Sequence, residues 1–156
     1  MTTPPFDLAQ AHRWFAVELN NLAWDLVEAA TRSPDEVERM IHAAHAACHH
    51  WLQVGSPLNH QRALCLLATA YAIAGRIESA VHYSALCLDL SDRNGETQSA
   101  FDRATAFGCS SVAAAAAGAH DRAEVFYVQA LDAAAKFEDA DDQSVFSRLY
   151  PPPPSV

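Results

Sequence analysis

Hydrophobic side chains recur at steps of three and four residues along most of the chain, which is the spacing of one face of an α-helix. No stretch shows the strict alternation of apolar and polar residues that is typical of a β-strand. The pattern predicts an all-α protein of about six helices. They are expected over residues 6–31 and 34–54, in a hairpin over 58–91 that folds back at Gly75, and over 96–117 and 120–137.

The predicted turns are evenly spaced along the chain. Gly75 and Gly118 lie about 43 residues apart, and each is followed five residues later by an alanine. The same step backwards from Gly75 reaches Arg32, between the first two helices. We therefore expect three helical hairpins with a common period.

The second hairpin resembles the tetratricopeptide repeat, in which an aromatic residue near the end of one helix and a small residue in the next allow close packing. The residues that carry this resemblance are Leu64, Leu67, Ala68, Tyr71, Gly75 and Ala80. In the third hairpin the stretch GAHDRAEVFYVQAL follows the same order, whereas the first hairpin matches only in spacing. A period of about 43 residues is similar to the extended repeats of kinesin light chains.

The resemblance implies a right-handed α-solenoid of three antiparallel hairpins, over about 6–54, 58–92 and 96–138, within one domain over 1–143. A tail over 144–156 would follow. The tail has two interpretations. In one, Phe146 and Tyr150 cap the last helix and the prolines are a disordered end. In the other, Pro151 to Pro154 form an extended polyproline segment that a partner recognises.

The resemblance also implies that the first helix of each hairpin lines a concave groove. The groove residues would be Arg62, Cys65, Thr69 and Ile73 in the second hairpin, Thr105, Gly108, Val112 and Ala116 in the third, and Leu22, Leu26 and Ala29 in the first, with Arg103 as a further cation. These side chains are small and mostly apolar, which favours a helix or an apolar peptide as the protein partner. Two alternatives stay open: the arc is too short to leave the groove open, or a second copy of the chain covers it as a homodimer.

The charge excludes several classes of function. The 156 residues carry a formal net charge of −9, from 10 basic and 19 acidic residues. Nucleic acids and anionic membranes attract clustered cations, so neither is expected as a partner. The first residues lack the basic start and continuous apolar stretch of a secretory signal. We expect a cytoplasmic protein whose four cysteines, Cys48, Cys65, Cys87 and Cys109, are separate buried thiols in helices.

The second helix carries a stripe of histidines, which is the main chemical alternative. His42, His45 and His49 fall on one side of the helix beside Glu38, and imidazole binds zinc, copper or nickel. The competing interpretation is that these histidines are solvated or bonded to carboxylates on the polar flank of the helix.

No catalytic motif is present, since the sequence has no GxSxG turn, HExxH helix or glycine-rich phosphate loop. The sequence therefore predicts a non-catalytic protein-interaction or scaffold module without a cofactor. The alternative is a helical metal-binding protein or metalloenzyme that uses the histidine stripe.

Overall fold

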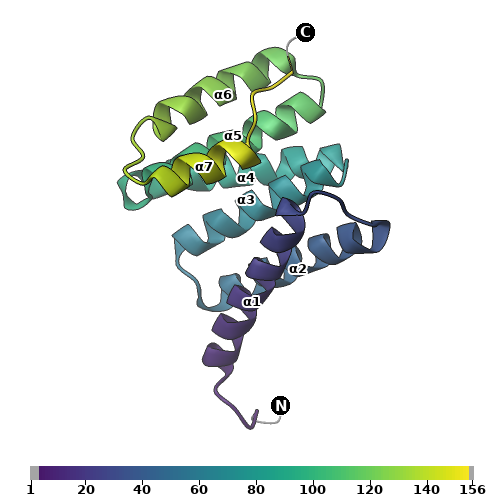
Figure 1. Ribbon diagram of the computed structural model, residues 1–156. Helices are drawn as coiled ribbons and strands as arrows, with labels where there is room; N and C mark the ends of the chain where they lie inside the picture. Colours follow the sequence, from purple (N-terminus) through teal and green to yellow (C-terminus); the bar gives the residue numbers. More distant parts are fainter. Residues whose placement is uncertain (1–3, 155–156) are drawn as a thin grey trace.

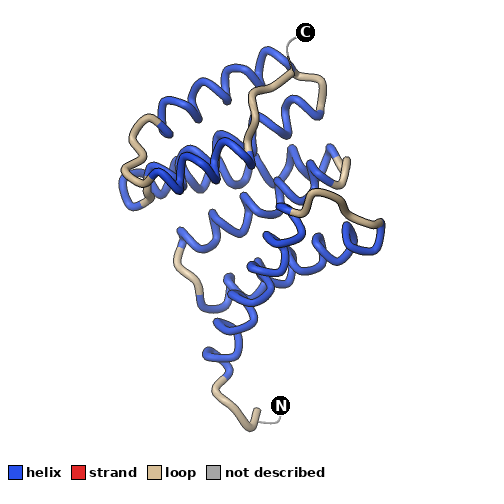
Figure 2. The backbone as a smooth tube through the Cα atoms, viewed as in Figure 1, coloured by secondary structure: helices blue, strands red, loops and turns tan. Residues whose placement is uncertain are grey.

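The computed structural model describes residues 4–154, and this part of the chain consists of helices and loops without a strand (Figure 2). The all-α prediction is confirmed. The α-helices are α1 (Leu8–Glu28), α2 (Pro34–Val54), α3 (Pro57–Ile73), α4 (Ile77–Asn94), α5 (Ala100–Ala116), α6 (His120–Ala134) and α7 (Ala140–Leu149), with a short 3-10 helix η1 (Gly95–Thr97) before α5.

Helices α1 to α6 form three hairpins, because α1 packs on α2, α3 on α4 and α5 on α6 (Figure 1). Neighbouring hairpins then stack through contacts of α3 with α2 and of α5 with α4. The first helices also touch one another, since α3 contacts both α1 and α5. We call the surface formed by α1, α3 and α5 the inner face. The right-handed sense of the stack stays a prediction.

Three helices begin with the same serine cap. The serine hydroxyl accepts a hydrogen bond from the backbone of the third helical residue, whose side chain bonds back to the serine N–H. The pairs are Ser33 with Glu36, Ser56 with Asn59, and Ser99 with Asp102. This arrangement satisfies backbone donors that a helix start leaves free. It explains why α2 begins at the residue that the sequence predicts.

The turns of the second and third hairpins have one geometry. Gly75 and Gly118 have φ angles of +68° and +74°, which a residue with a side chain adopts only with strain. In the second hairpin, Arg76 N–H donates to the Tyr71 carbonyl over 2.9 Å. The first hairpin has no such glycine, and the Arg32 guanidinium caps the end of α1 instead. It donates to the carbonyls of Leu26, Val27 and Ala29.

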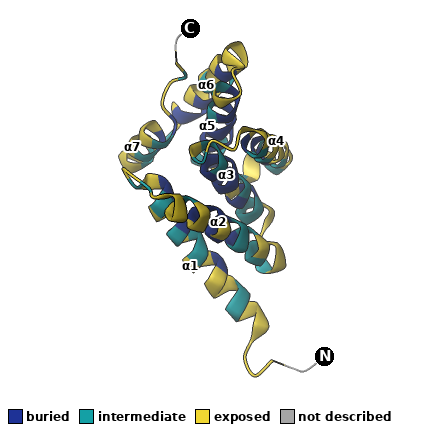
Figure 3. Ribbon diagram, turned by 90° about the vertical axis from the view of Figure 1, so that its right-hand side faces the viewer, coloured by how far each residue is buried: buried dark blue, intermediate teal, exposed yellow. Residues whose placement is uncertain are grey.

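Alanine dominates the buried positions, so the helices approach closely. Buried residues are concentrated on α3 and α5, in the middle of the protein (Figure 3). One buried cluster spans α1, α2 and α3 around Met40, Leu66 and Leu67. The other spans α3 to α7 and contains Phe107 and Tyr150 together with several alanines. In the described residues, none of the helices has the length and apolar character to cross a bilayer.

The structure corrects the end of the chain. The sixth helix was expected to continue to residue 137, and a tail was expected over residues 144–156. Instead α6 ends at Ala134 and a seventh helix, α7, begins at Ala140. The Asp139 carboxylate accepts a hydrogen bond from Asp141 N–H over 2.9 Å. The acidic run is therefore a helix start, where carboxylates cap free N–H groups and oppose the helix dipole favourably.

Replacing Gly75 with alanine tests the turn geometry. We expect Gly75→Ala to lower the free energy of unfolding by about 1 kcal/mol, because the added Cβ disfavours a positive φ. Gly75→Asn is the control and should cost less, since asparagine tolerates this region better. Urea denaturation measures both, and an Ala variant as stable as the native chain would contradict the assigned turn.

Candidate functional site

Helix α7 lies against the inner face, on the opposite side of α3 and α5 from α4 (Figure 3). The contact comes from the end of the helix. Phe146 and Tyr150 are each only 1% exposed, and Leu149 packs against both buried clusters. Phe146 and Tyr150 are thus buried in the fold, at the end of a seventh helix that was not expected from the sequence. The groove implied by the sequence is partly filled by the chain itself.

Tyr150 occupies the space that the missing side chain of Gly108 leaves on α5. A Cβ atom added to Gly108 would lie 2.6 Å from Cγ of the Tyr150 ring, closer than real Cβ contacts. The Tyr150 hydroxyl reaches α3, where it lies 3.2 Å from Cys65 Sγ and 3.3 Å from Thr69 Oγ1. Burial, followed by the neighbouring Cys65, raises the pKa of Tyr150 well above its usual value. The phenol therefore stays neutral.

A pocket of about 260 Å³ remains between α7 and the inner face. Every first helix of a hairpin contributes to it, and α7 forms the remaining wall. Its lining residues are Asn20, Trp24 and Glu28 of α1, Arg62 and Cys65 of α3, Phe101, Asp102 and Thr105 of α5, and Val145, Leu149 and Tyr150 at the end of the chain. We call this pocket, together with the surface under α7, the groove.

One wall of the groove carries an ion pair between Arg62 and Asp102. Arg62 Nε donates to Asp102 Oδ1 over 2.7 Å, and Arg62 Nη2 donates to Oδ2 over 3.0 Å. Burial raises the pKa of the Asp102 carboxyl, but the bonds from Arg62 and Ser99 outweigh it and leave the pKa lowered. Both members are thus ionised, and Arg62 keeps 54% of its side chain exposed. Because Arg62 already binds the carboxylate of Asp102, it is not free to bind the carboxylate of a partner.

Five predicted groove residues lie around the end of α7. Arg62, Cys65 and Thr105 line the pocket, Thr69 contacts the Tyr150 hydroxyl, and Gly108 meets the Tyr150 ring. The other three of the second and third hairpins, Ile73, Val112 and Ala116, lie elsewhere, and Ala116 is exposed at the end of α5.

Ile73, near the end of α3, is 36% exposed, and Val112 packs against the buried cluster around Phe107. The register of α1 differs from expectation as well. Leu22 and Leu26 pack into the cluster of α1, α2 and α3, so the other side of α1 faces the groove.

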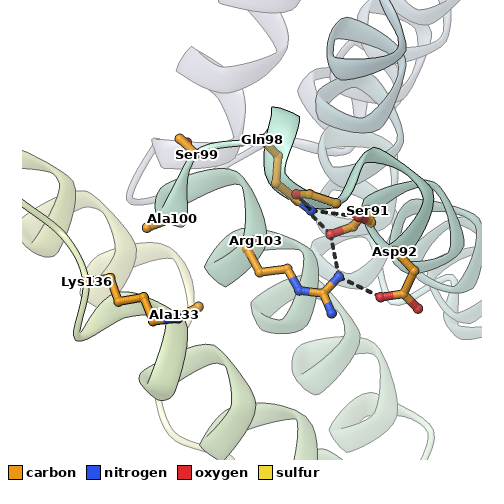
Figure 4. A pocket seen from close by; sticks show the side chains of 9 residues that line it. Ser91, Asp92, Gln98, Ser99, Ala100, Arg103, Ala133 and Lys136 are labelled. Atoms are coloured by element: carbon orange, nitrogen blue, oxygen red, sulfur yellow. Dashed lines mark hydrogen bonds and ion pairs between the residues drawn. The ribbon is translucent and has the colours of Figure 1, made fainter.

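Arg103 points away from the groove. Its guanidinium donates to Ser91 Oγ over 2.9 Å and to Asp92 Oδ1 over 2.6 Å, both on α4. Figure 4 shows these contacts beside a second pocket of about 380 Å³, with Lys136, in the turn after α6, on its other side. Asp92 neutralises the arginine, so this pocket offers less positive charge than its residues suggest.

The structure separates the predicted histidine stripe. His45 Nε2 lies 2.7 Å from the Tyr71 hydroxyl, and its ring packs edge-on to Tyr71 and Tyr83. His42, by contrast, is exposed. Within the described chain, no three histidine nitrogens lie close enough to share one ion.

A different histidine pair forms between α1 and α2. His12 Nδ1 lies 2.8 Å from His50 Nδ1, and Phe15 stacks on the His50 ring. His49 flanks this pair, with its ring centre 6.4 Å from that of His12. Sequence reasoning missed the pair because His12 lies on another helix, in a position that only the packing angle of α1 and α2 determines.

Sequence reasoning also treated the buried cysteines as independent. The structure brings Cys65, Cys87 and Cys109 together, with their Sγ atoms within 4.8 Å of one another. One signal was present: the three cysteines are evenly spaced along the chain, one on each of three consecutive helices.

A double-mutant cycle that replaces Gly108 and Tyr150 with alanine tests the contact between the end of α7 and α5. In the native chain, we expect Gly108→Ala to lower the free energy of unfolding by about 2 kcal/mol, because the Cβ overlaps the ring. In a Tyr150→Ala background the same change should raise it by about 0.5 to 1 kcal/mol, since alanine is the better helix former.

Tyr127→Ala, on the outer helix α6, is the matched control. In this background Gly108→Ala should still lower the free energy of unfolding by about 2 kcal/mol, because the two effects add. Urea denaturation measures all six free energies. An equal penalty for Gly108→Ala with and without Tyr150 would show that the ring does not occupy this position.

Acidification should weaken the fold through His45 and His50. Burial, followed by the charge of His42, lowers the pKa of His45; burial, followed by His12 and His49, lowers that of His50. The unfolded chain therefore binds protons more readily just below 6.5, the ordinary pKa of histidine. Stability should be full above this pH and fall as pH decreases through 6.5 to the folded pKa values.

His45→Gln should reduce this pH dependence. Urea denaturation between pH 5.0 and 7.5 gives the slope of the free energy of unfolding against pH. An unchanged slope in His45→Gln would contradict the assigned environment of His45.

The comparisons with known proteins find no match for this chain among protein-family models, curated proteins or solved structures. Its function must therefore be inferred from its own residues and their geometry.

Proposed function

We propose that this chain is a non-catalytic, tetratricopeptide-like interaction module that binds an amphipathic helix of a protein partner in the groove. The observation that carries the proposal is the placement of α7. An amphipathic helix from the chain itself already lies there, with two aromatic side chains inserted. Helix-in-groove binding works in this way, through apolar anchors at helical spacing rather than through charge pairing.

The contacts of α7 indicate which kind of partner helix would fit the groove. Phe146 and Tyr150 lie one helical turn apart, and each is fully enclosed. Between them, Arg148 Nη2 donates to Glu28 Oε2 of α1 over 2.6 Å. Both partners of this ion pair are substantially exposed, so it contributes little stability and mainly orients the helix. A partner helix with two aromatic residues one turn apart and a cation between them satisfies the same surface.

Helix α7 would then act as an intramolecular competitor. A tethered segment has an effective concentration in the millimolar range, so a partner must bind more tightly than α7 or meet a chain whose α7 has detached. The pocket of about 260 Å³ beside Leu149 offers additional space that α7 leaves unfilled. A partner that fills this space gains contact area that the intramolecular helix lacks.

We further propose that the protein works in a reducing compartment such as the cytoplasm. All four cysteines are free thiols, and three are buried in the core. Thiols in this state are typical of reducing conditions.

A labelled peptide of residues 140–154 tests the groove. We expect it to bind the full-length Phe146→Ala/Tyr150→Ala variant at least ten-fold more tightly than the native chain, because the native groove is occupied. Fluorescence anisotropy measures binding, and circular dichroism checks that the variant is folded.

Two controls define the site. A peptide with Phe146→Ala and Tyr150→Ala should not bind, and adding Gly108→Ala to the protein variant should abolish binding by closing the space for the ring. Equal binding to the native and double-variant chains would contradict the proposal, as would a folded variant that binds no peptide.

A further inference from the structure

Three cysteine side chains meet in the middle of the protein, where the second and third hairpins join. Cys65 comes from α3, Cys87 from α4 and Cys109 from α5, and their Sγ atoms lie within 4.8 Å of one another. All three are buried, with exposed fractions of 5%, 0% and 1%. In the described part of the chain, no other group of three or more histidine, cysteine, aspartate or glutamate side chains is close enough to hold an ion.

The thiols are ordered by weak hydrogen bonds to nearby oxygen atoms. Cys65 Sγ lies 3.6 Å from the Thr105 carbonyl, Cys87 Sγ 3.5 Å from the Gln61 carbonyl, and Cys109 Sγ 3.3 Å from the Ala106 carbonyl. Such bonds suit protonated thiols, which are weak donors. The cluster is therefore neutral when no ion is bound.

The surroundings penalise any net charge on the cluster. All three sulfur atoms lie in the protein core, where water does not stabilise a charge. Asp102, which is paired with Arg62, adds a negative charge near Cys87. A buried complex is stable here only if the ion cancels the charge of its ligands.

We infer that Cys65, Cys87 and Cys109 form a three-sulfur site for a trivalent thiophilic ion, of which arsenic(III) is the representative. In water at neutral pH this ion is the uncharged arsenous acid, As(OH)3. Three thiols react with it to form three As–S bonds, and each thiol proton leaves with a hydroxyl group as water. Three water molecules are released, arsenic stays trivalent and no oxidant is needed. The product is neutral.

The common divalent and monovalent ions fit this site less well. Three thiolates leave a charge of −1 around Zn²⁺, which in addition prefers four ligands. Around Cu(I) the charge is −2. Arsenic(III) takes three sulfur ligands in a pyramid and carries a lone pair on its open side, so it needs no fourth donor.

The geometry requires only a small adjustment. Two sulfur atoms at about 2.3 Å from one ion lie roughly 3.8 Å apart in a tetrahedral arrangement, and somewhat closer in the pyramid that arsenic(III) forms. Thiols within 4.8 Å reach this spacing by small side-chain rotations.

The groove provides a route to the cluster. Cys65 lines the pocket, and the Tyr150 hydroxyl lies 3.2 Å from its sulfur. An uncharged ligand can enter past Tyr150 without the desolvation cost of an ion. Cys65 belongs to the cluster and also contacts the Tyr150 hydroxyl. An As–S bond at Cys65 therefore removes the contact that Tyr150 makes with the thiol. The site itself does not depend on the proposed binding of a protein partner.

Titration of the reduced full-length protein with arsenite tests this site. We expect one arsenic per chain, with three of the four thiols lost to a thiol reagent, and three sulfur neighbours around arsenic in X-ray absorption. Binding to the folded state should also raise the thermal midpoint. Cys87→Ser should weaken binding at least 100-fold, because only two thiols remain.

Cys48→Ser is the matched control, since Cys48 lies outside the cluster, and it should leave binding unchanged. Circular dichroism shows whether each variant is folded, and the titration of the native chain decides the question without any variant. Failure of the native chain to bind arsenite stoichiometrically would overturn the inference. Tighter binding of Zn²⁺ than of arsenite would overturn the charge argument, and native-like binding by folded Cys87→Ser would overturn the ligand set.

Discussion

The missing side chain at Gly108 determines where Tyr150, and with it α7, packs on the rest of the protein. It leaves on α5 a space of the width of an aromatic ring, and Tyr150 fills that space so closely that a single Cβ atom would overlap the ring. The ring and Phe146 hold α7 on the inner face, because the exposed ion pair of Arg148 with Glu28 contributes little. Without this contact, the surface of α3 and α5 beneath α7 would be open to solvent.

The same contact links the two features that this structure offers for function. Tyr150 covers the groove and, through its hydroxyl, lies against Cys65 of the thiol cluster. The small residues that line α3 and α5 allow both arrangements, since they bring the helix axes close enough for three cysteines to meet. A partner that displaces α7 would therefore also uncover a thiol, and a ligand on the thiols would loosen α7.

Local chemistry made much of the fold predictable. The capping box of Ser33 with Glu36 and the glycines at positions 75 and 118 depend only on residues close together in the chain. The start of α2 and two of the turns therefore follow from the sequence. The seventh helix was missed because its acidic start resembles a loop in composition. The meeting of Cys65, Cys87 and Cys109 and the pairing of His12 with His50 depend on how helices pack, which periodicity does not specify.

The account depends most on the position of Tyr150, and nuclear magnetic resonance of the native chain measures it directly. The ring of Tyr150 should show strong Overhauser contacts to the α-protons of Gly108, and its ring current should shift those protons upfield. Their absence, with random-coil shifts over residues 140–150 in an otherwise folded protein, would contradict the docked α7 on which the groove and its proposed occupant depend.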